Sequence, residues 1–212
     1  MDATQLLIDQ KIVPVVVVDD ARNAVGLANT LAEAGLTAIE VTLRTPAALE
    51  AIELIAKSVP DCLLGAGSVN TAAQLQQVKD IGARFAVSPG ASAELIDAAA
   101  KVALPLVPGA ATASEVMTLQ VAGYSLLKMF PAELNGGTAW LSAISGPLPS
   151  ATFFPTGGVK PDNAKAYLAL DNVQCIGGTW IASRDAIKAA DFAAIKANAC
   201  DALDLLEPSK QS

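Results

Sequence analysis

The stretch AIEVTLR at residues 38–44 decides the fold, because its alternating side chains give the two faces of a strand different surroundings. Glu40, Thr42 and Arg44 share one face of an extended chain, and the residues between them are aliphatic. In a parallel sheet, return helices cover the aliphatic face. We therefore expect the polar face to point into the enclosed interior of a sheet that closes on itself.

Seven more apolar, β-rich runs accompany this stretch, and the starts of consecutive runs lie 19 to 27 residues apart. The eight expected strands are residues 13–18, 38–43, 63–68, 85–89, 104–109, 126–131, 153–158 and 174–178. Ala-rich stretches with helical periodicity lie between them, such as residues 23–34, 46–57, 71–81 and 92–101. Repeated strand–helix–strand units form right-handed parallel crossovers, and eight of them close into a (β/α)₈ TIM barrel.

An open, doubly wound α/β sheet is the alternative architecture for this alternation. It does not need eight similar units, and its usual GxGxxG motif does not follow the first expected strand. We therefore predict a single barrel domain over residues 1–212. An extra helix around residues 6–8 is expected to cover the bottom of the barrel, and residues 208–212 are expected to be frayed.

Composition excludes several classes of function. The net charge of -7, without a Lys or Arg cluster, argues against a nucleic-acid partner. Three widely spaced cysteines and the absence of histidine indicate neither a disulfide framework nor a metal site. The chain begins without a secretory leader, and no apolar run approaches the roughly 18 residues of a membrane span. We expect a cytoplasmic protein that does not act at a membrane.

Lys128 lies in the apolar run LLKMF at residues 126–130, whereas the other lysines fall in helical or loop stretches. It shares one face of the expected strand with Leu126 and Phe130. If that face points inward, the amine enters the barrel, where burial favours the neutral form that a Schiff base requires. The alternative is a salt-bridged or snorkelling lysine without a catalytic role.

Glu40 is the only glutamate within an expected strand. It lies on the second strand and Lys128 on the sixth, so the two side chains can occupy one interior layer. The sequence therefore favours an acid beside the amine, with a structural Glu40–Arg44 ion pair as the alternative.

Small and polar residues mark the carboxyl ends of other expected strands, where barrel active sites form. The glycine pairs in PTGG at 155–158 and IGGT at 176–179 are typical of phosphate sites, because glycine lets backbone amides approach an anion. Pro161 indicates a helix start just beyond the first pair. Ser68 can bind a carboxylate or cap the helix expected near Thr71.

With these motifs in place, the chain resembles the 2-keto-3-deoxy-6-phosphogluconate (KDPG) and 4-hydroxy-2-oxoglutarate (KHG) aldolase family over about residues 5–205. The motifs that carry the resemblance are IEVTLRT at 39–45, GAGSV at 65–69, PG at 108–109, LKMFPAE at 127–133, PTGGV at 155–159 and GGTW at 177–180.

The resemblance implies a class I aldolase that cleaves a phosphorylated keto acid, KDPG, into pyruvate and glyceraldehyde 3-phosphate. It needs no cofactor beyond the covalent Schiff base, and it is expected to be a homotrimer. Lys128 would form the Schiff base and Glu40 would move protons. The implied substrate-binding residues are Arg44 and Ser68 for the carboxylate, Gly157, Gly158 and Thr179 for the phosphate, and Phe130 beside the substrate, with Pro89, Gly109, Thr156 and Gly178 completing the expected site.

Three positions depart from the commoner family pattern: Ser68 replaces Thr, Thr179 replaces Ser, and Met129 replaces an aromatic residue or Leu. The first two keep a hydroxyl. The alternatives are cleavage of 4-hydroxy-2-oxoglutarate or of the galactonate epimer, a non-aldolase phosphate-binding barrel enzyme, and a noncatalytic binding or assembly protein. The segment LRT at residues 43–45 favours the gluconate-type substrate by resemblance.

Overall fold

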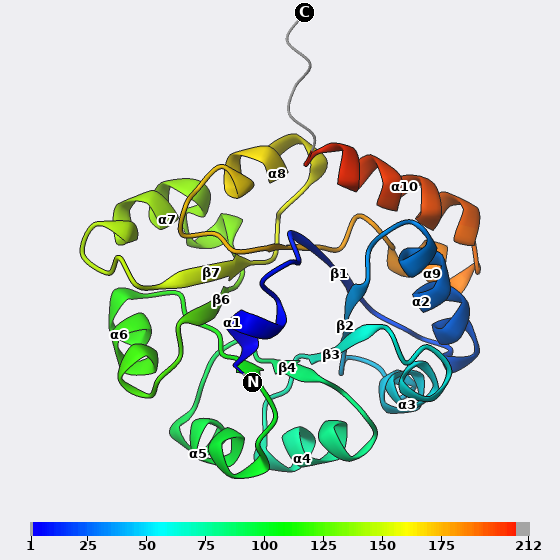
Figure 1. Ribbon diagram of the computed structural model, residues 1–212, viewed down its shortest axis with the longest axis horizontal. Coiled ribbons are helices and arrows are strands. Elements are labelled where there is room, and N and C mark those ends of the chain that lie inside the picture. Colours follow the sequence, from blue (N-terminus) through cyan, green and yellow to red (C-terminus); the bar gives the residue numbers. More distant parts are fainter. Residues whose placement is uncertain (1, 207–212) are drawn as a thin grey trace, which may run out of the picture.

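Eight parallel strands alternate with helices along the chain in the computed structural model, which describes residues 2–206 (Figure 1). The strands are β1 Ile12–Val16, β2 Ala38–Thr42, β3 Leu63–Gly67, β4 Phe85–Val87, β5 Leu106–Val107, β6 Leu126–Met129, β7 Thr152–Pro155 and β8 Ile176–Gly178. The helices are α1 Ala3–Leu6, η1 Ala21–Asn23, α2 Ala24–Glu33, α3 Ala48–Ser58, α4 Ala72–Asp80, α5 Ala93–Val102, α6 Ala113–Val121, η2 Glu133–Asn135, α7 Gly137–Ser145, α8 Pro161–Leu168, α9 Arg184–Lys188 and α10 Phe192–Asp204. The frayed tail expected at residues 208–212 lies outside the described residues.

The strands form a closed ring. Six of them pair in the order β5-β4-β3-β2-β1-β8, and β6 pairs with β7. The backbone of Lys128 joins β6 to the end of β5, because its N–H donates to Pro108 O and its carbonyl accepts from Ala110 N, both at 2.9 Å. A bridge between Thr156 and Gly177 joins β7 to β8. The predicted (β/α)₈ barrel is thereby confirmed.

Several strands are shorter than predicted. The strand expected at 104–109 is reduced to β5, because Pro105 and Pro108 flank it and proline has no N–H to donate. The strand expected at 153–158 ends at β7, because Gly157 and Gly158 adopt φ angles of 94° and 84° and turn the chain away. These interruptions lie at the carboxyl ends of the strands, where the chain leaves the sheet.

Strand parity divides the apolar core into two clusters. Ile39, Val41 and Leu127 belong to the cluster between the strands and the outer helices. Ala38 and Leu126 belong to a second cluster inside the ring. The predicted orientation of residues 38–44 and 126–130 is therefore confirmed, since adjacent residues of each strand face opposite sides.

An N-terminal helix is present as expected, but as α1 it spans Ala3–Leu6, a few residues before the predicted position around 6–8, and it closes the end of the barrel at which the strands begin. Ala3 and Leu7 belong to the inner cluster. Thr4 Oγ1 lies 2.8 Å from Ser125 Oγ, and Gln174 Nε2 donates to Thr4 O. Because Ser125 and Gln174 precede β6 and β8, these contacts hold α1 against the amino ends of the strands.

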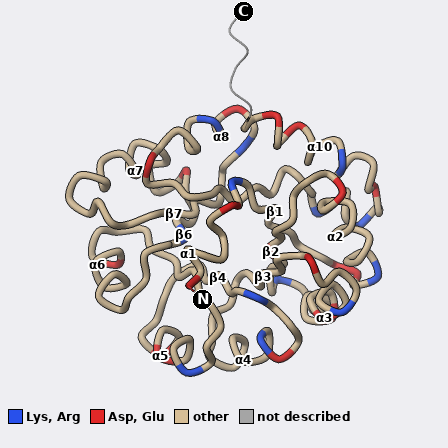
Figure 2. The backbone as a smooth tube through the Cα atoms, in the orientation of Figure 1, with Lys and Arg blue, Asp and Glu red and all other residues tan. Residues whose placement is uncertain are grey.

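The outer helices follow the predicted stretches within a few residues, and hydroxyl groups cap several of them. Thr71 and Ser92 accept hydrogen bonds from the third backbone N–H of α4 and α5, contributing about 1 kcal/mol each. Charged residues of both signs are spread around the outer helices (Figure 2). Within residues 2–206, no helix has the length and apolar character needed to cross a membrane.

Candidate active site

A buried ion pair lies inside the barrel near the carboxyl ends of the strands. Lys128 on β6 places Nζ 2.8 Å from Glu40 Oε1 and 3.2 Å from Oε2, across the ring from β2. The two residues are 3% and 0% exposed. The structure thus brings together the amine and the acid that the sequence placed in one interior layer.

Burial and pairing act in opposite directions on the charges of this pair. Removing an ammonium and a carboxylate from water costs several kcal/mol each, and their mutual attraction offsets much of that cost. The structure places beside the amine an acid that can accept its proton. Passing one proton from Lys128 to Glu40 gives a neutral amine and removes both buried charges together.

Two glycines on β3 make room inside the barrel, Gly67 for the ion pair and Gly65 for the Phe85 ring. A Cβ atom on Gly67 would lie 2.1 Å from Glu40 Oε1, and one on Gly65 would lie 2.2 Å from the ring of Phe85. The register pairs Glu40 with Gly65 and Thr42 with Gly67. Both glycines belong to the GAGSV motif at residues 65–69, but this steric role was not predicted from the sequence. The sequence did contain a sign of this role. The two glycines occupy inward-facing positions of β3, next to the inward-facing Glu40 and Thr42 of β2.

Aromatic rings surround the Lys128 amine. Nζ lies 5.7 Å from the ring centroid of Phe130 and 5.8 Å from that of Phe154, distances at which a ring attracts a cation. Phe154 on β7 is paired in register with Lys128, and sequence reasoning had not singled it out. The rings also limit the access of water to the amine.

Arg44 shares the Phe130 ring with the amine and contacts Ser68. Arg44 Nε donates to Ser68 Oγ at 3.0 Å, and the guanidinium carbon is 5.9 Å from the centroid of Phe130. Ser68 adopts φ 58°, a left-handed conformation, and Thr71 caps α4 instead. The alternatives of a Glu40–Arg44 ion pair and a Ser68 helix cap are therefore both wrong. The two side chains therefore form one polar group just beyond the carboxyl ends of β2 and β3.

We use the term glycine loop for residues 156–160, which connect β7 to α8. Lys160 N donates to Asn163 Oδ1 at 2.8 Å, and Pro161 starts the helix as predicted. The Thr156–Gly177 bridge sets this loop beside the end of β8, which carries Gly178 and the exposed Thr179. Backbone amides, a hydroxyl and a helix N-terminus therefore meet at the expected phosphate position.

Pro89 and Gly109 belong to the turns after β4 and β5. A Cβ atom on Gly109 would lie 2.2 Å from Pro89 O, so only glycine allows the two turns to touch. Gly109 also forms a bridge with Lys128. These residues therefore support the wall of the barrel next to the amine.

The sequence that builds this geometry matches a known family. The model of the family described as KDPG and KHG aldolase matches residues 4–198. The chain belongs to this family. A similar protein, the 2-dehydro-3-deoxy-phosphogluconate aldolase of Pseudoalteromonas atlantica, is 48% identical over 181 residues, covering 85% of this chain and 84% of the relative.

Further aldolases of the family cover nearly the whole chain. The KHG/KDPG aldolase of Escherichia coli is 44% identical over 202 residues, or 95% of each chain. A crystal structure of KDPG aldolase from Legionella pneumophila, with pyruvate captured at low pH as a covalent carbinolamine, superposes with a TM-score of 0.92. It is 42% identical and covers 94% of this chain and 97% of its own.

Other nucleophiles and ligand groups of this aldolase-family chain are less suited to chemistry. Burial raises the pKa of the Cys62 thiol to about 11 and raises that of Cys175 further, so both stay protonated near neutral pH. Within residues 2–206, no three His, Cys, Asp or Glu side chains gather closely enough to hold a metal ion. Among these groups, the Lys128 amine is therefore the best placed nucleophile.

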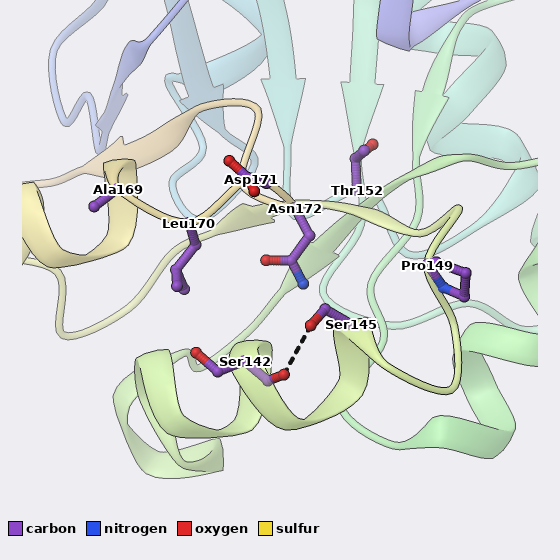
Figure 3. A pocket seen from close by; sticks show the side chains of 8 residues that line it. All are labelled: Ser142, Ser145, Pro149, Thr152, Ala169, Leu170, Asp171 and Asn172. Atoms are coloured by element: carbon purple, nitrogen blue, oxygen red, sulfur yellow. Dashed lines mark hydrogen bonds between the residues drawn. The ribbon is translucent and has the colours of Figure 1, made fainter.

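A pocket of about 400 Å³ opens elsewhere, between α7 and the segment that leads from α8 into β8 (Figure 3). Ser142, Ser145 and Asp171 line it, together with Thr152 at the start of β7 and Asn172 ahead of β8. Strands begin at this end of the barrel, so the pocket lies opposite the Lys128 amine and is separate from the candidate active site.

Proposed function

We propose that this protein is a class I aldolase that cleaves KDPG into pyruvate and D-glyceraldehyde 3-phosphate. The observation that carries the proposal is the buried Lys128 amine, 2.8 Å from Glu40 Oε1, in a chain of the KDPG and KHG aldolase family. Membership of the family supports the substrate class, and the amine–acid pair supports the Schiff-base route.

The first steps form the Schiff base. Glu40 accepts a proton from Lys128, and the neutral amine attacks the C2 ketone to give a carbinolamine. Glu40 then returns the proton to the departing C2 hydroxyl, so that water leaves and an iminium ion forms. The crystal structure of the Legionella relative contains the corresponding pyruvate carbinolamine, which supports this order of steps.

The carbon–carbon bond breaks next. Glu40, now a carboxylate, takes the C4 hydroxyl proton directly or through water, and the electrons of the C3–C4 bond flow into the iminium. Glyceraldehyde 3-phosphate leaves, and an enamine remains on Lys128. Proton return to C3 and hydrolysis release pyruvate and restore the amine. The iminium supplies the electron sink, so the proposed reaction requires no cofactor.

Two anion sites would hold the ends of the substrate. Arg44 offers a planar fork of donors to the C1 carboxylate, and Ser68 adds a hydroxyl. The glycine loop, Gly178 and Thr179 would take the 6-phosphate at the opposite end of the molecule. Thr156 Oγ1, which is buried and without a partner among the described residues, would face the substrate between these sites.

Membership of the family also supports a proposal on oligomeric state, cellular location and partners. We propose that the active form is a homotrimer in the cytoplasm, that residues 1–212 act as one domain, and that its partners are pyruvate and a phosphorylated keto acid, with no nucleic acid or membrane. Analytical ultracentrifugation of the purified chain tests the trimer directly.

Reductive trapping tests the central claim. Incubation with pyruvate and sodium borohydride should add one reduced pyruvate to the protein, and peptide mapping should place it on Lys128. Lys188, at the exposed end of α9, serves as an internal control and should remain unmodified. Failure to label Lys128, or labelling spread over several lysines, would contradict the Schiff-base mechanism.

4-Hydroxy-2-oxoglutarate is the second candidate substrate, because the Escherichia coli relative is named a KHG/KDPG aldolase. The same amine and acid would cleave it to pyruvate and glyoxylate, without using the phosphate site. Comparison of kcat/KM for KDPG, its galactonate epimer and 4-hydroxy-2-oxoglutarate separates the three. We expect KDPG to have the highest value.

A further inference from the structure

The turn after β6 is bonded to the glycine loop. Ala132 N donates to Thr156 O at 2.8 Å, and Glu133 N donates to Gly157 O at 3.1 Å. Asn163 Nδ2, from the first turn of α8, donates to Gly158 O at 3.1 Å. The carbonyl groups of the loop are therefore held by donors of the protein itself.

The orientation of these carbonyls fixes the orientation of the neighbouring amides. In a planar trans peptide, the N–H points opposite to the C=O of the same unit. Because the carbonyls of Gly157 and Gly158 point to protein donors, the N–H groups of Gly158 and Val159 point away from those donors. A phosphate bound at the loop would meet these two N–H groups.

The side chain of Glu133 crosses the glycine loop to reach α8. A Cβ atom on Gly158 would lie 2.5 Å from Glu133 Cγ, so only glycine lets the side chain pass. On the far side, the hydroxyl of Tyr167 donates to Glu133 Oε1. A Cβ atom on Gly137 would lie 3.0 Å from the same Oε1 and 3.2 Å from the Tyr167 hydroxyl oxygen.

The Tyr167 hydroxyl is suited to be a permanent donor. The residue is fully buried on α8. Burial, and then the hydrogen bond to the Glu133 carboxylate, raise the pKa of Tyr167 well above its usual range. The proton therefore stays on the tyrosine near neutral pH, and the bond to the Glu133 carboxylate is charge-assisted.

We propose that Glu133 and Tyr167 are positioning residues that hold the glycine loop in its anion-binding conformation and fix its distance from Lys128. The Glu133–Tyr167 pair links the turn after β6, the strand that carries the amine, to α8, the helix that follows the loop. The proposal rests on the proposed function, because it concerns the phosphate end of that substrate.

The variants Tyr167→Phe and Glu133→Ala remove one partner each, and Glu133→Gln keeps an acceptor of the same length. Tyr124→Phe is the matched control, since Tyr124 precedes β6 at the opposite end of the barrel. The measurements are KM and kcat for KDPG and for the unphosphorylated keto acid, competitive inhibition by inorganic phosphate, the rate of pyruvate trapping, and Tm.

Tyr167→Phe and Glu133→Ala should each raise KM for KDPG about tenfold, which corresponds to a charge-assisted hydrogen bond of about 1.4 kcal/mol. They should weaken phosphate inhibition by the same factor. The kcat, the rate of pyruvate trapping and kcat/KM for the unphosphorylated acid should stay within about twofold. Glu133→Gln should recover most of the affinity, and Tyr124→Phe should match the unmodified protein.

Equal losses on both substrates, or unchanged phosphate inhibition in all variants, would overturn the positioning role. If Tyr167→Phe does not fold, the two Glu133 variants decide, because Glu133 is exposed and its replacement leaves the core intact. If the unmodified protein fails to trap pyruvate, the proposed function fails and this inference with it. If it traps pyruvate and binds phosphate but the variants bind phosphate equally well, only the inference fails.

Discussion

The two ends of the barrel are built from the same strands but have opposite characters. Toward the amino ends, the inner cluster is apolar, and α1 closes it with Ala3 and Leu7. The next inward-facing residue after Ala38 on β2 is Glu40, and the next after Leu126 on β6 is Lys128. Glu40 and Lys128 form the buried ion pair. One end is therefore suited to stability and the other to chemistry.

The difference shows how a barrel tolerates buried charge. At the active end, Glu40 and Lys128 pair with each other, Arg44 donates to the Ser68 hydroxyl, and Gly67 on β3 leaves space for the pair. The closed end has no such requirement, because its side chains are apolar and pack on α1. Substitutions at the active end should therefore lower turnover, and substitutions at the closed end should lower stability.

Lys128→Met should have the largest effect. It removes the covalent route, so kcat should fall by more than about 10⁴-fold and pyruvate trapping should disappear. Steady-state turnover and borohydride labelling measure this. Leu126→Met, on the same face of β6 but at the closed end, should cost less than about 1.5 kcal/mol and leave turnover unchanged. If Lys128→Met retained turnover, the conclusion that the chemistry depends on the amine at the carboxyl end of the barrel would be wrong.

Glu40→Gln should have the next largest effect. It keeps the size of the side chain but cannot move protons, so kcat should fall by about 10²–10⁴-fold. Single-turnover cleavage measures the loss. Pyruvate trapping should slow but persist, because Lys128 is intact. Glu50→Gln in the first turn of α3 is the control for loss of an acidic charge, and it should behave as the unmodified protein does.

Gly67→Ala tests whether the space beside the pair matters. The added methyl would lie 2.1 Å from Glu40 Oε1, so it must push the carboxylate away from Lys128. We expect kcat to fall, though by less than in Glu40→Gln, and stability to drop by about 1–3 kcal/mol. Gly90→Ala is the matched control, because nothing lies within 4 Å of its added Cβ. Equal kinetics in both variants would show that the pair needs no such space.

Leu7→Ala should have the smallest effect on turnover and a clear effect on stability. Leu7 is fully buried beneath the inner cluster, so its truncation should lower the free energy of unfolding by about 2–5 kcal/mol. The kcat should remain within about twofold. Urea unfolding and turnover of the same preparation measure both, with Ile8→Ala, at a residue 48% exposed, as the control. A large loss of kcat would show that the two ends are coupled.

Much of the fold was predictable because periodicity is a local property. The alternation at residues 38–44 and 126–130 identified which side chains face inward, and the repeat of apolar runs gave eight strands. The ends of the strands were less predictable. The prolines and glycines that end strands are visible in the sequence. The exact residue at which a strand ends also depends on whether an adjacent strand offers backbone hydrogen-bond partners there, which the sequence does not show.

The sequence by itself determined the parity of Glu40 and Lys128, the closed ring of strands, and the motifs that carry the resemblance to the KDPG and KHG aldolase family. The partners of the side chains emerged only from the tertiary structure. Glu40 pairs with Lys128 and not with Arg44. Arg44 donates a hydrogen bond to Ser68, and Tyr167 donates one to Glu133. The physical reason is that alternation fixes the face of a side chain, whereas its partner depends on the height and angle at which distant strands meet around the ring.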